Sequence, residues 1–322
     1  MKNSGFKEIE RIILKAKKIL VATHQGPDGD AIGSLAAFGF YLKKIKKPHY
    51  LLCISSVPES LRFIPGVKLI KSKYPKIFYD LLVGLDYGTK NQLGLEGYFK
   101  KYPKTPLLAL DHHLLSGQDA DFGVIKSECS SVGELLYDYF KAVEFKMDRK
   151  VAQALAVSIL SDTNFFKYTD NPKPLEKIID LMKRFKIKPV EIDNALNGQM
   201  NMAAMKLSGV ILNRAEYNHQ GDFVYSWLTR KELNERHLTT DDLSDIIIEQ
   251  LKNLIDGRFS LLLVEETKGK IRGRLRSRPD KKFNVAKLAM KINGGGHKYA
   301  AGFRTKGTID SVLKLVAKYA KK

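Results

Sequence analysis

Short apolar runs alternate with helical patterns through the first half of the chain, and this alternation limits the fold more than any other feature. The apolar runs are Ile19–Ala22, Tyr50–Ile54, Leu81–Leu85 and Leu107–Leu110. Apolar residues recur with a helical period over Ala31–Ile45, Val132–Phe140 and Val151–Leu160. Short apolar strands that alternate with helices indicate a parallel sheet covered by helices on both faces. We therefore expect an α/β fold for this half.

A second pattern of strands and helices begins near Ala215. Strands are expected at Phe223–Leu228, Phe259–Val264 and Ile271–Arg276, and helices at Val285–Ile292 and Ile309–Ala320. The residues between the two patterns look helical throughout. A chain of 322 residues is long enough for two domains. We predict an α/β domain over residues 1–188, a helical linker over 189–214 and a smaller α/β domain over 215–322.

The composition favours a reducing compartment and an anionic partner. The formal net charge of +20 attracts polyanions, although a generally lysine-rich composition gives the same number. No apolar stretch is long enough for a membrane helix, and the first residues mix acids with bases instead of forming a signal peptide. Two cysteines, Cys53 and Cys129, cannot build a disulfide framework. We expect a cytoplasmic protein with two packed thiols and no membrane partner.

Acids and a histidine gather directly after the first predicted strand. His24, Asp28 and Asp30 lie within seven residues, and the glycines and proline among them favour a tight turn before a helix. Carboxylates and an imidazole at this spacing suit a divalent ion such as Mn²⁺ or Mg²⁺. Taken alone, the segment fits equally well a turn with solvated acids and a capping aspartate.

Three further places repeat this pattern at the ends of predicted elements. They are Asp86 after Leu81–Leu85, Asp111-His112-His113 after Leu107–Leu110, and Asp162 after the helical run Val151–Leu160. Each alone could be a turn or a cap. The carboxyl ends of parallel strands share one edge of a sheet, so together these acids would concentrate negative charge there. Clustered carboxylates are stable when cations neutralise them, and the sequence therefore predicts a site for two divalent ions.

The combination of His24-x-x-x-Asp28-x-Asp30, Asp86, Asp111-His112-His113 and Asp162 resembles the motif set of the DHH phosphoesterase superfamily. Near the end of the chain, Gly294-Gly295-Gly296-His297 resembles the glycine-rich signature of the accompanying DHHA1 domain, and Arg276-Ser277-Arg278 precedes it. The resemblance covers nearly the whole chain. It implies an N-terminal parallel-sheet DHH domain and a smaller C-terminal α/β DHHA1 domain, of a length similar to the nanoRNase and pAp phosphatase subgroup.

The resemblance also implies roles for single residues. The first ion would be held by His24, Asp28 and Asp86. The second would be held by Asp30, Asp86, His112 and Asp162, with Asp86 bridging. The implied catalytic residues are Asp86, His113 beside the scissile phosphate, and Asp111, which would orient the histidines. The implied substrate-binding residues are Arg276, Ser277, Arg278, Gly294, Gly295, Gly296 and His297. Mn²⁺ is the metal that the resemblance favours, and Mg²⁺ and Co²⁺ stay open.

The residues of the second domain support phosphate binding without the resemblance. Three consecutive glycines present bare backbone N–H groups, which can surround a phosphate. Arg276 and Arg278 lie two residues apart, on the same side of a predicted strand, and guanidinium groups bind phosphate in a bidentate way. A flexible turn and a solvated strand face explain the same residues equally simply.

The expected activity is hydrolysis of short oligoribonucleotides, about two to five nucleotides long, to mononucleotides, and of pAp to AMP. A hydroxide held by the two ions would attack phosphorus, with substrate bound between the domains. A cyclic or linear dinucleotide phosphodiesterase, of the c-di-AMP or pApA type, is the nearest alternative. Relatives that act on single-stranded DNA are longer, and pyrophosphatases lack the glycine-rich signature. A non-catalytic RNA- or nucleotide-binding protein is the alternative outside enzymes, and a homodimer is one assembly that the chain could form.

Overall fold

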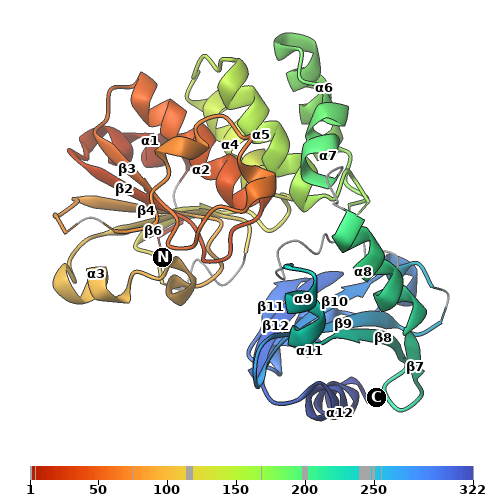
Figure 1. The fold of residues 1–322 in the computed structure, drawn as a ribbon. Coiled ribbons are helices and arrows are strands. Elements are labelled where there is room, and N and C mark those ends of the chain that lie inside the picture. Colours follow the sequence, from red (N-terminus) through yellow and green to blue (C-terminus); the bar gives the residue numbers. More distant parts are fainter. Residues whose placement is uncertain are drawn as a thin grey trace. The chain divides into compact units, whose positions relative to one another are not determined.

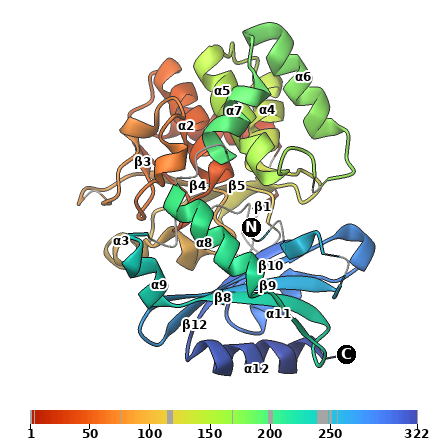
Figure 2. The same cartoon turned by 45° about the vertical axis from the view of Figure 1, so that its right-hand side comes forward.

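The computed structural model describes residues 2–3, 5–74, 76–113, 119–167, 169–197, 202–238, 248, 251–254 and 256–321. The chain forms two compact units, Met1–Gly198 and Gln199–Lys322, and each contains its own six-stranded sheet (Figures 1 and 2). The predicted linker spans this division, with α7 (Pro189–Asn197) in the first unit and α8 (Met202–Asn213) in the second. The predicted domain limits at 188 and 215 stay predictions.

The sheet of the first unit is parallel throughout, in the order β1-β6-β5-β4-β2-β3. Its strands are β1 (Lys2–Asn3), β2 (Ile19–Ala22), β3 (His49–Leu52), β4 (Leu81–Leu85), β5 (Leu107–Asp111) and β6 (Phe122–Ile125). Every residue of β2, β4 and β5 is buried, which is why these strands appear in the sequence as continuous apolar runs. The predicted α/β fold with a parallel sheet is confirmed.

Helices cover this sheet on both faces. They are α1 (Phe6–Lys15), α2 (Gly29–Lys44), α3 (Glu96–Lys101), α4 (Val132–Ala142), α5 (Arg149–Asp162) and α6 (Lys173–Phe185), with short 3₁₀ turns at Glu59–Leu61, Val67–Leu69 and Lys90–Leu93. Successive residues of β2 enter different cores, because side chains alternate along a strand. Val21 packs in the core with α1, α2, α4 and α5, whereas Leu20 packs with Tyr98 of α3. The helix α3 lies on the other face of the sheet from α1, α2, α4 and α5 (Figure 1).

The connections of this sheet change direction at its carboxyl edge. From β2 the chain passes through α2 to β3 on one side, and β4, β5 and β6 then follow on the other side. The strand order therefore reverses between β2 and β4. Open α/β sheets bind ligands at such a point, outside the carboxyl ends of the strands.

The second unit contains a mixed sheet in the order β11-β12-β10-β9-β8-β7, in which β8 and β9 run parallel and the other described neighbours run antiparallel. Its strands are β7 (Glu216–Asn218), β8 (Phe223–Leu228), β9 (Phe259–Thr267), β10 (Lys270–Ser277), β11 (Gly295–His297) and β12 (Ala300–Lys306). Its helices are α8, α9 (Arg230–Glu235), α11 (Val285–Met290) and α12 (Ile309–Ala320), with a 3₁₀ turn at Pro279–Lys281. One apolar core lies under α11 and α12 and another under α8, on opposite faces of the sheet (Figure 2).

No helix in the described part of the chain combines the length and the apolar character needed to cross a bilayer. Cys53 and Cys129 are both buried and both carry free thiols.

Candidate active site

The segment after β2 places His24 and Asp28 at the carboxyl edge of the sheet. Asp28 caps α2, and its Oδ1 accepts a hydrogen bond from the backbone N–H of Ala31 at 3.0 Å. Nδ1 of His24 lies 3.0 Å from the carbonyl oxygen of Gln25. This contact directs the opposite nitrogen, Nε2, toward Oδ2 of Asp86 at 3.6 Å and Oδ1 of Asp28 at 4.0 Å. The predicted turn thus brings its histidine and first aspartate together.

Asp86, the first residue after β4, contacts two different groups of side chains. Its side chain is almost completely buried, and its backbone has a φ of +49°, which is uncommon for any residue except glycine. Oδ2 faces His24, whereas Oδ1 lies 3.6 Å from Nε2 of His112 and 3.4 Å from Nδ1 of His113. The two carboxylate oxygens therefore serve different neighbours, which is the arrangement that a bridging ligand requires.

Asp111 orients the two histidines that follow it. Its Oδ1 accepts hydrogen bonds from the backbone N–H groups of His112 and His113, at 2.7 and 3.0 Å, and from Nδ1 of His113 at 2.9 Å. Its Oδ2 accepts hydrogen bonds from the backbone N–H groups of Tyr87 and Gly88, at 2.8 and 3.2 Å. The carboxylate is fully buried. These contacts give Asp111 a positioning role, and they tie the loop after β4 to the histidines after β5.

His112 lies at the centre of a second group of carboxylates. Its Nδ1 lies 3.2 Å from the carbonyl oxygen of Cys129, which directs Nε2 toward the acids. Nε2 lies 3.5 Å from Oδ2 of Asp162, 3.6 Å from Oδ1 of Asp86 and 3.9 Å from Oδ2 of Asp30. The structure thus brings together the four residues predicted to share one ion.

The close approach of α2 and α5 places Asp30 beside Asp162. Asp30 lies in the first turn of α2, and Asp162 is the last residue of α5. A Cβ atom added at Gly33 would lie 2.6 Å from the carbonyl oxygen of Ala154, so only glycine allows this helix spacing. The glycine within the motif therefore serves packing, and the packing delivers the two carboxylates to one place.

Asp30 is held by donors that the sequence analysis did not identify. The hydroxyl groups of Ser34 and Ser158 donate hydrogen bonds to its Oδ1. The backbone N–H of Val132, at the start of α4, donates to Oδ2 at 2.8 Å, and that of Gly133 donates to Oδ1 at 3.2 Å. Ser34 could have been found, because it lies one helical turn after Asp30. The other three donors depend on long-range packing.

The concentrated negative charge shifts the pKa values of the site. Burial, together with the charge of Asp86, raises the pKa of Asp30 to about 7. Burial also raises the pKa of Asp162 well above its ordinary value. Burial alone would lower the pKa of His24, but its hydrogen bond to Asp86 and the neighbouring charges outweigh burial and raise the pKa to about 10. The pKa of His112 is raised well above its ordinary value by the same balance. The field of the site strongly favours positive charge.

These donors fit divalent cations. Among the described residues, ligand atoms within 4.8 Å of one another form three groups: His24 with Asp28 and Asp86; Asp30 with His112 and Asp162; and Asp86 with Asp111, His112 and His113, which shares a residue with each of the other two. Imidazole nitrogens and carboxylate oxygens together suit Mn²⁺ and related ions. Metal-binding histidines commonly hold their second nitrogen against a carbonyl oxygen, as both His24 and His112 do here. Cations would also offset the charge of the buried acids.

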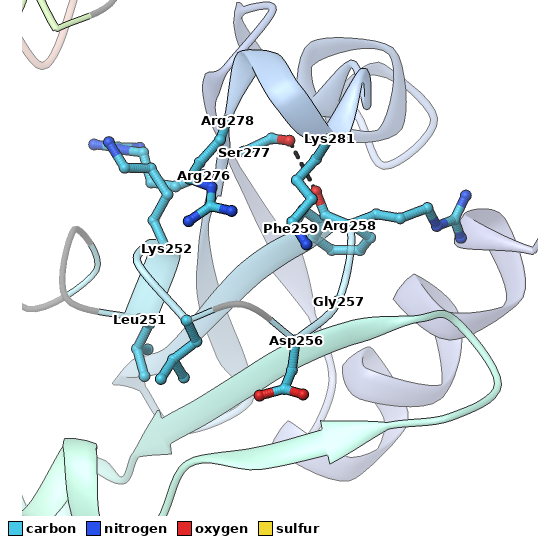
Figure 3. Close-up of a pocket in the computed structure, with 11 residues that line it drawn as sticks. Leu251, Lys252, Asp256, Gly257, Arg258, Phe259, Arg276, Ser277, Arg278 and Lys281 are labelled. Carbon is cyan, nitrogen blue, oxygen red and sulfur yellow. Dashed lines mark hydrogen bonds between the residues drawn. The ribbon is translucent and has the colours of Figure 1, made fainter.

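Basic side chains of the second unit gather at a pocket near the end of β10 (Figure 3). The charged residues that line it are Lys252, Asp256, Arg258, Arg276, Arg278 and Lys281. Arg276 is the last arginine of β10, whereas Arg278 lies just beyond the strand. The guanidinium of Arg278 donates two hydrogen bonds to Asp280, at 3.1 and 2.8 Å. The two predicted arginines therefore line one pocket, and one of them already contacts a carboxylate.

Ser277 plays a different part from its neighbours in the sequence. Its side chain is buried, and its hydroxyl donates a hydrogen bond to the carbonyl oxygen of Arg258 at 2.9 Å (Figure 3). The guanidinium of Arg258 in turn binds the carbonyl oxygens of Gly221 and Ala320. These contacts serve the interior of the unit, so the geometry favours a packing role for Ser277 over the predicted contact with substrate.

Gly295 and Gly296 of the glycine run lie in strand β11 instead of an open loop. Its residues pair with β12, so that Gly295 lies opposite Gly302 and Gly296 opposite Ala301. A Cβ atom at Gly294 would lie 2.2 Å from the carbonyl oxygen of Gly302, and one at Gly296 would also meet backbone atoms. A Cβ atom at Gly295 would meet nothing within 4 Å. Two of the three glycines are therefore required by packing. The backbone of His297 lies in β11, and its side chain is outside the described part of the structure.

Comparison with known proteins agrees with this architecture. The family model described as the DHH family, N-terminal domain, matches residues 18–159, and the model described as the DHHA1 domain matches residues 220–322. Each unit thus contains one of the two domains, in the order that the motifs imply.

Curated relatives match along most of the chain. A protein of Mycoplasma genitalium named bifunctional oligoribonuclease and PAP phosphatase NrnA is 23% identical over 305 residues, which cover 94% of this chain and 93% of the relative. The protein of the same name from Bacillus subtilis is 25% identical over 299 residues, covering 92% and 91%.

A solved structure shares the fold over nearly the full length. The crystal structure of an exopolyphosphatase-related protein from Bacteroides fragilis superposes with a TM-score of 0.87 at 23% identity, and the match covers 98% of this chain and 95% of that one. With both domains matched in order along the chain, this protein belongs to the DHH/DHHA1 family of divalent-metal-dependent phosphoesterases.

Proposed function

We propose that this protein hydrolyses RNA oligomers of about two to five nucleotides to mononucleotides and removes the 3′-phosphate of pAp. The observation that carries the proposal is the position of Asp86, whose two oxygens face the His24 group and the His112 group separately. The names of the relatives from Mycoplasma genitalium and Bacillus subtilis support the choice of substrates. Two buried, free thiols suit the reducing cytoplasm, where we place the protein.

In this proposal, His24, Asp28 and Asp86 hold one cation, and Asp30, Asp86, His112 and Asp162 hold the other. We propose Mn²⁺ for both positions, because the ligands combine imidazole nitrogens with carboxylate oxygens. When bound, such ions lower the pKa of water and offset the charge of the reacting phosphate.

His113 is the side chain that we place against the scissile phosphate. Its Nδ1 lies 2.9 Å from Asp111, which fixes the plane of the ring and directs Nε2 to the opposite side. Burial lowers the pKa of His113, but the hydrogen bond to Asp111 outweighs burial and raises it. A raised pKa favours the protonated ring, which donates a hydrogen bond to a phosphate oxygen and offsets the charge that develops there.

The deciding experiment is a substrate panel assayed with Mn²⁺, with Mg²⁺ and with a chelator. The panel contains 5′-phosphorylated RNA of two to five nucleotides, a longer RNA, pAp, linear dinucleotides and cyclic dinucleotides, and products are identified by chromatography. We expect fast, chelator-sensitive release of mononucleotides from the short RNAs and of AMP from pAp. A preference for cyclic dinucleotides would identify the alternative phosphodiesterase, and binding without turnover would identify a nucleotide-binding protein.

Asp86→Asn tests the bridging carboxylate itself. We expect Asp86→Asn to lower kcat about 10³-fold, because the amide lacks the negative charge of the bridging carboxylate and its loss removes several kcal/mol of charge stabilisation. Asp310→Asn is the matched control, because Asp310 is an exposed helix residue paired with Lys314. Near-normal turnover by Asp86→Asn would refute the proposed site.

A further inference from the structure

One face of β10 carries a row of arginines. Ile271, Gly273 and Leu275 face the core under α11 and α12, and the intervening residues point to the other face because side chains alternate along a strand. These intervening residues are Arg272, Arg274 and Arg276, and all three are partly exposed. A central strand of the second sheet therefore presents three guanidinium groups on one face.

The surface beside the middle of this row lacks side chains. Gly302 of β12 lies directly opposite Arg274, and Gly295 of β11 lies opposite Gly302, so all three share one face. A Cβ atom at Gly295 would meet nothing within 4 Å, and one at Gly302 would meet only the carbonyl oxygen of Gly273, at 3.2 Å. We call Gly295 and Gly302 the glycine floor. It leaves room for a ligand on the sheet, next to the guanidinium of Arg274.

The two ends of the row differ in charge. At one end, Glu266 lies 3.7 Å from Arg272 and accepts hydrogen bonds from Arg304 at 2.9 and 3.1 Å. At the other end, Arg276 lines the basic pocket of Figure 3 with Lys252 and Lys281. An anionic ligand would therefore enter at the pocket end and be limited at the carboxylate end.

The spacing of the row suits a chain of phosphates. Alternate residues of a strand lie about 6.6 Å apart. Successive phosphates of an extended single strand are separated by a comparable distance. Guanidinium groups bind phosphate in a bidentate way, and this binding does not depend on the base sequence of the nucleic acid. Arg274 thus lies one phosphate further along the row from Arg276.

We propose that Arg274 is a second phosphate-binding position. The glycine floor then accommodates the nucleoside that links the phosphate bound by Arg274 to the phosphate bound by Arg276. This inference rests on the proposed function and adds a length preference to it. Substrates with one phosphate besides the scissile one, such as pAp and the RNA dimer, use the Arg276 position. From the trimer onward a second phosphate reaches Arg274, and the catalytic efficiency rises.

The test compares Arg274→Gln with Arg304→Gln on pAp and on 5′-phosphorylated RNA of two to five nucleotides. Arg304 is the matched control, because it lies on the same face of the sheet and pairs with Glu266. We expect Arg274→Gln to lower kcat/KM about tenfold or more on trimers to pentamers, to leave pAp and the dimer nearly unchanged, and so to flatten the dependence on length. Arg304→Gln is expected to behave as the wild type.

Gly295→Val is a second, independent variant. A β-branched side chain suits a strand, and a Cβ atom at Gly295 would meet nothing within 4 Å, but the side chain would occupy the space assigned to the nucleoside. We expect the same length-dependent loss with an unchanged melting temperature.

Binding supplies a readout that does not need turnover. In the inactive Asp86→Asn background, pentamer affinity measured at several salt concentrations gives the number of phosphates engaged, about 0.7 of slope for each in a single strand. Arg274→Gln should lower that slope by about this amount. If the wild type cleaves no member of the panel, the proposed function fails while the slope still tests Arg274. Equal losses on pAp and on trimers, an unchanged slope, or identical behaviour of the two arginine variants would overturn the inference.

Discussion

The two charged regions of this protein are built in opposite ways. At the carboxyl edge of the first sheet, Asp30, Asp86 and Asp111 are almost completely buried and are held by backbone N–H groups and imidazoles. On the second sheet, the arginines of β10 are partly exposed and lie beside glycines. The difference separates two tasks. Chemistry needs charges held in one geometry before substrate arrives, whereas recognition of a phosphate chain needs accessible cations and free space.

Metal stoichiometry gives the largest expected effect and tests whether the buried region is one site or two. We expect calorimetry to find two Mn²⁺ ions per chain for the wild type. Asp28→Asn should weaken one ion and Asp162→Asn the other, because each residue belongs to only one ligand group. Asp86→Asn should weaken both, by more than the roughly 10–100-fold that follows loss of an outer contact. Equal effects of all three variants on a single ion would contradict the division into two groups.

Asp111→Asn tests whether Asp111 positions neighbouring groups or contacts the reacting atoms itself. The amide cannot accept all of the hydrogen bonds that now reach this carboxylate, so the loop after β4 and the ring of His113 lose their common anchor. We expect metal affinity and kcat to fall about 10–100-fold, with KM nearly unchanged. A loss as large as that of Asp86→Asn would mean that Asp111 contacts the reacting atoms.

Two glycine-to-alanine variants compare the packing of the two regions directly. At Gly33 a Cβ atom would press on the backbone of Ala154 in α5, so we expect a loss of about 1–2 kcal/mol of unfolding free energy, even after the better helix propensity of alanine. At Gly295 the added Cβ atom meets open space, and we expect a change within about 0.5 kcal/mol. Urea denaturation without metal measures both. Equal stability of the two variants would remove the contrast.

The smallest expected effect is a change in the free energy of unfolding at Glu232, a partly buried carboxylate of the second unit that accepts several hydrogen bonds. Glu232 completes the capping box of α9 by accepting a hydrogen bond from the backbone N–H of Thr229, and it binds Arg214; these contacts outweigh its burial and lower its pKa from 4.5 to about 2. A lowered pKa adds stability that is complete above pH 4.5 and disappears as the pH falls through about 2. We expect Glu232→Gln to lose about 1 kcal/mol at neutral pH, and the difference from the wild type to shrink between these pH values. A difference that persists below pH 2 would exclude this origin.

The sequence predicted strands well where both of their faces are buried. Ile19–Ala22 and Leu81–Leu85 were predicted to the residue, because a doubly buried strand has no polar positions to obscure its limits. Phe122–Ile125 and Ala300–Lys306 were not predicted as strands. Both contain glycine, and their neighbours in the sheet, not their own composition, make them strands.

The candidate site shows the same limit. Most of its candidate ligands could be proposed from the sequence because they follow strand ends, which topology brings to one edge, whereas Asp162 ends helix α5. The contacts that orient them could not, because Ser158 lies 128 residues from Asp30, and the carbonyl oxygen of Cys129 has no signature in its side chain. In the second unit, the local pair of Arg278 and Asp280 was within reach of the sequence, since only two residues separate them. The pairing of the glycine run with β12 was not, because it depends on register.

The left-handed backbone of Asp86 restricts the amino acids that evolution can place there. Glycine would relieve the conformation but delete the carboxylate, and asparagine would keep the conformation but lose the negative charge. Glutamate would retain the charge on a longer arm, at a residue type that seldom adopts this conformation. Aspartate alone meets both demands, so this single position admits almost no neutral variation.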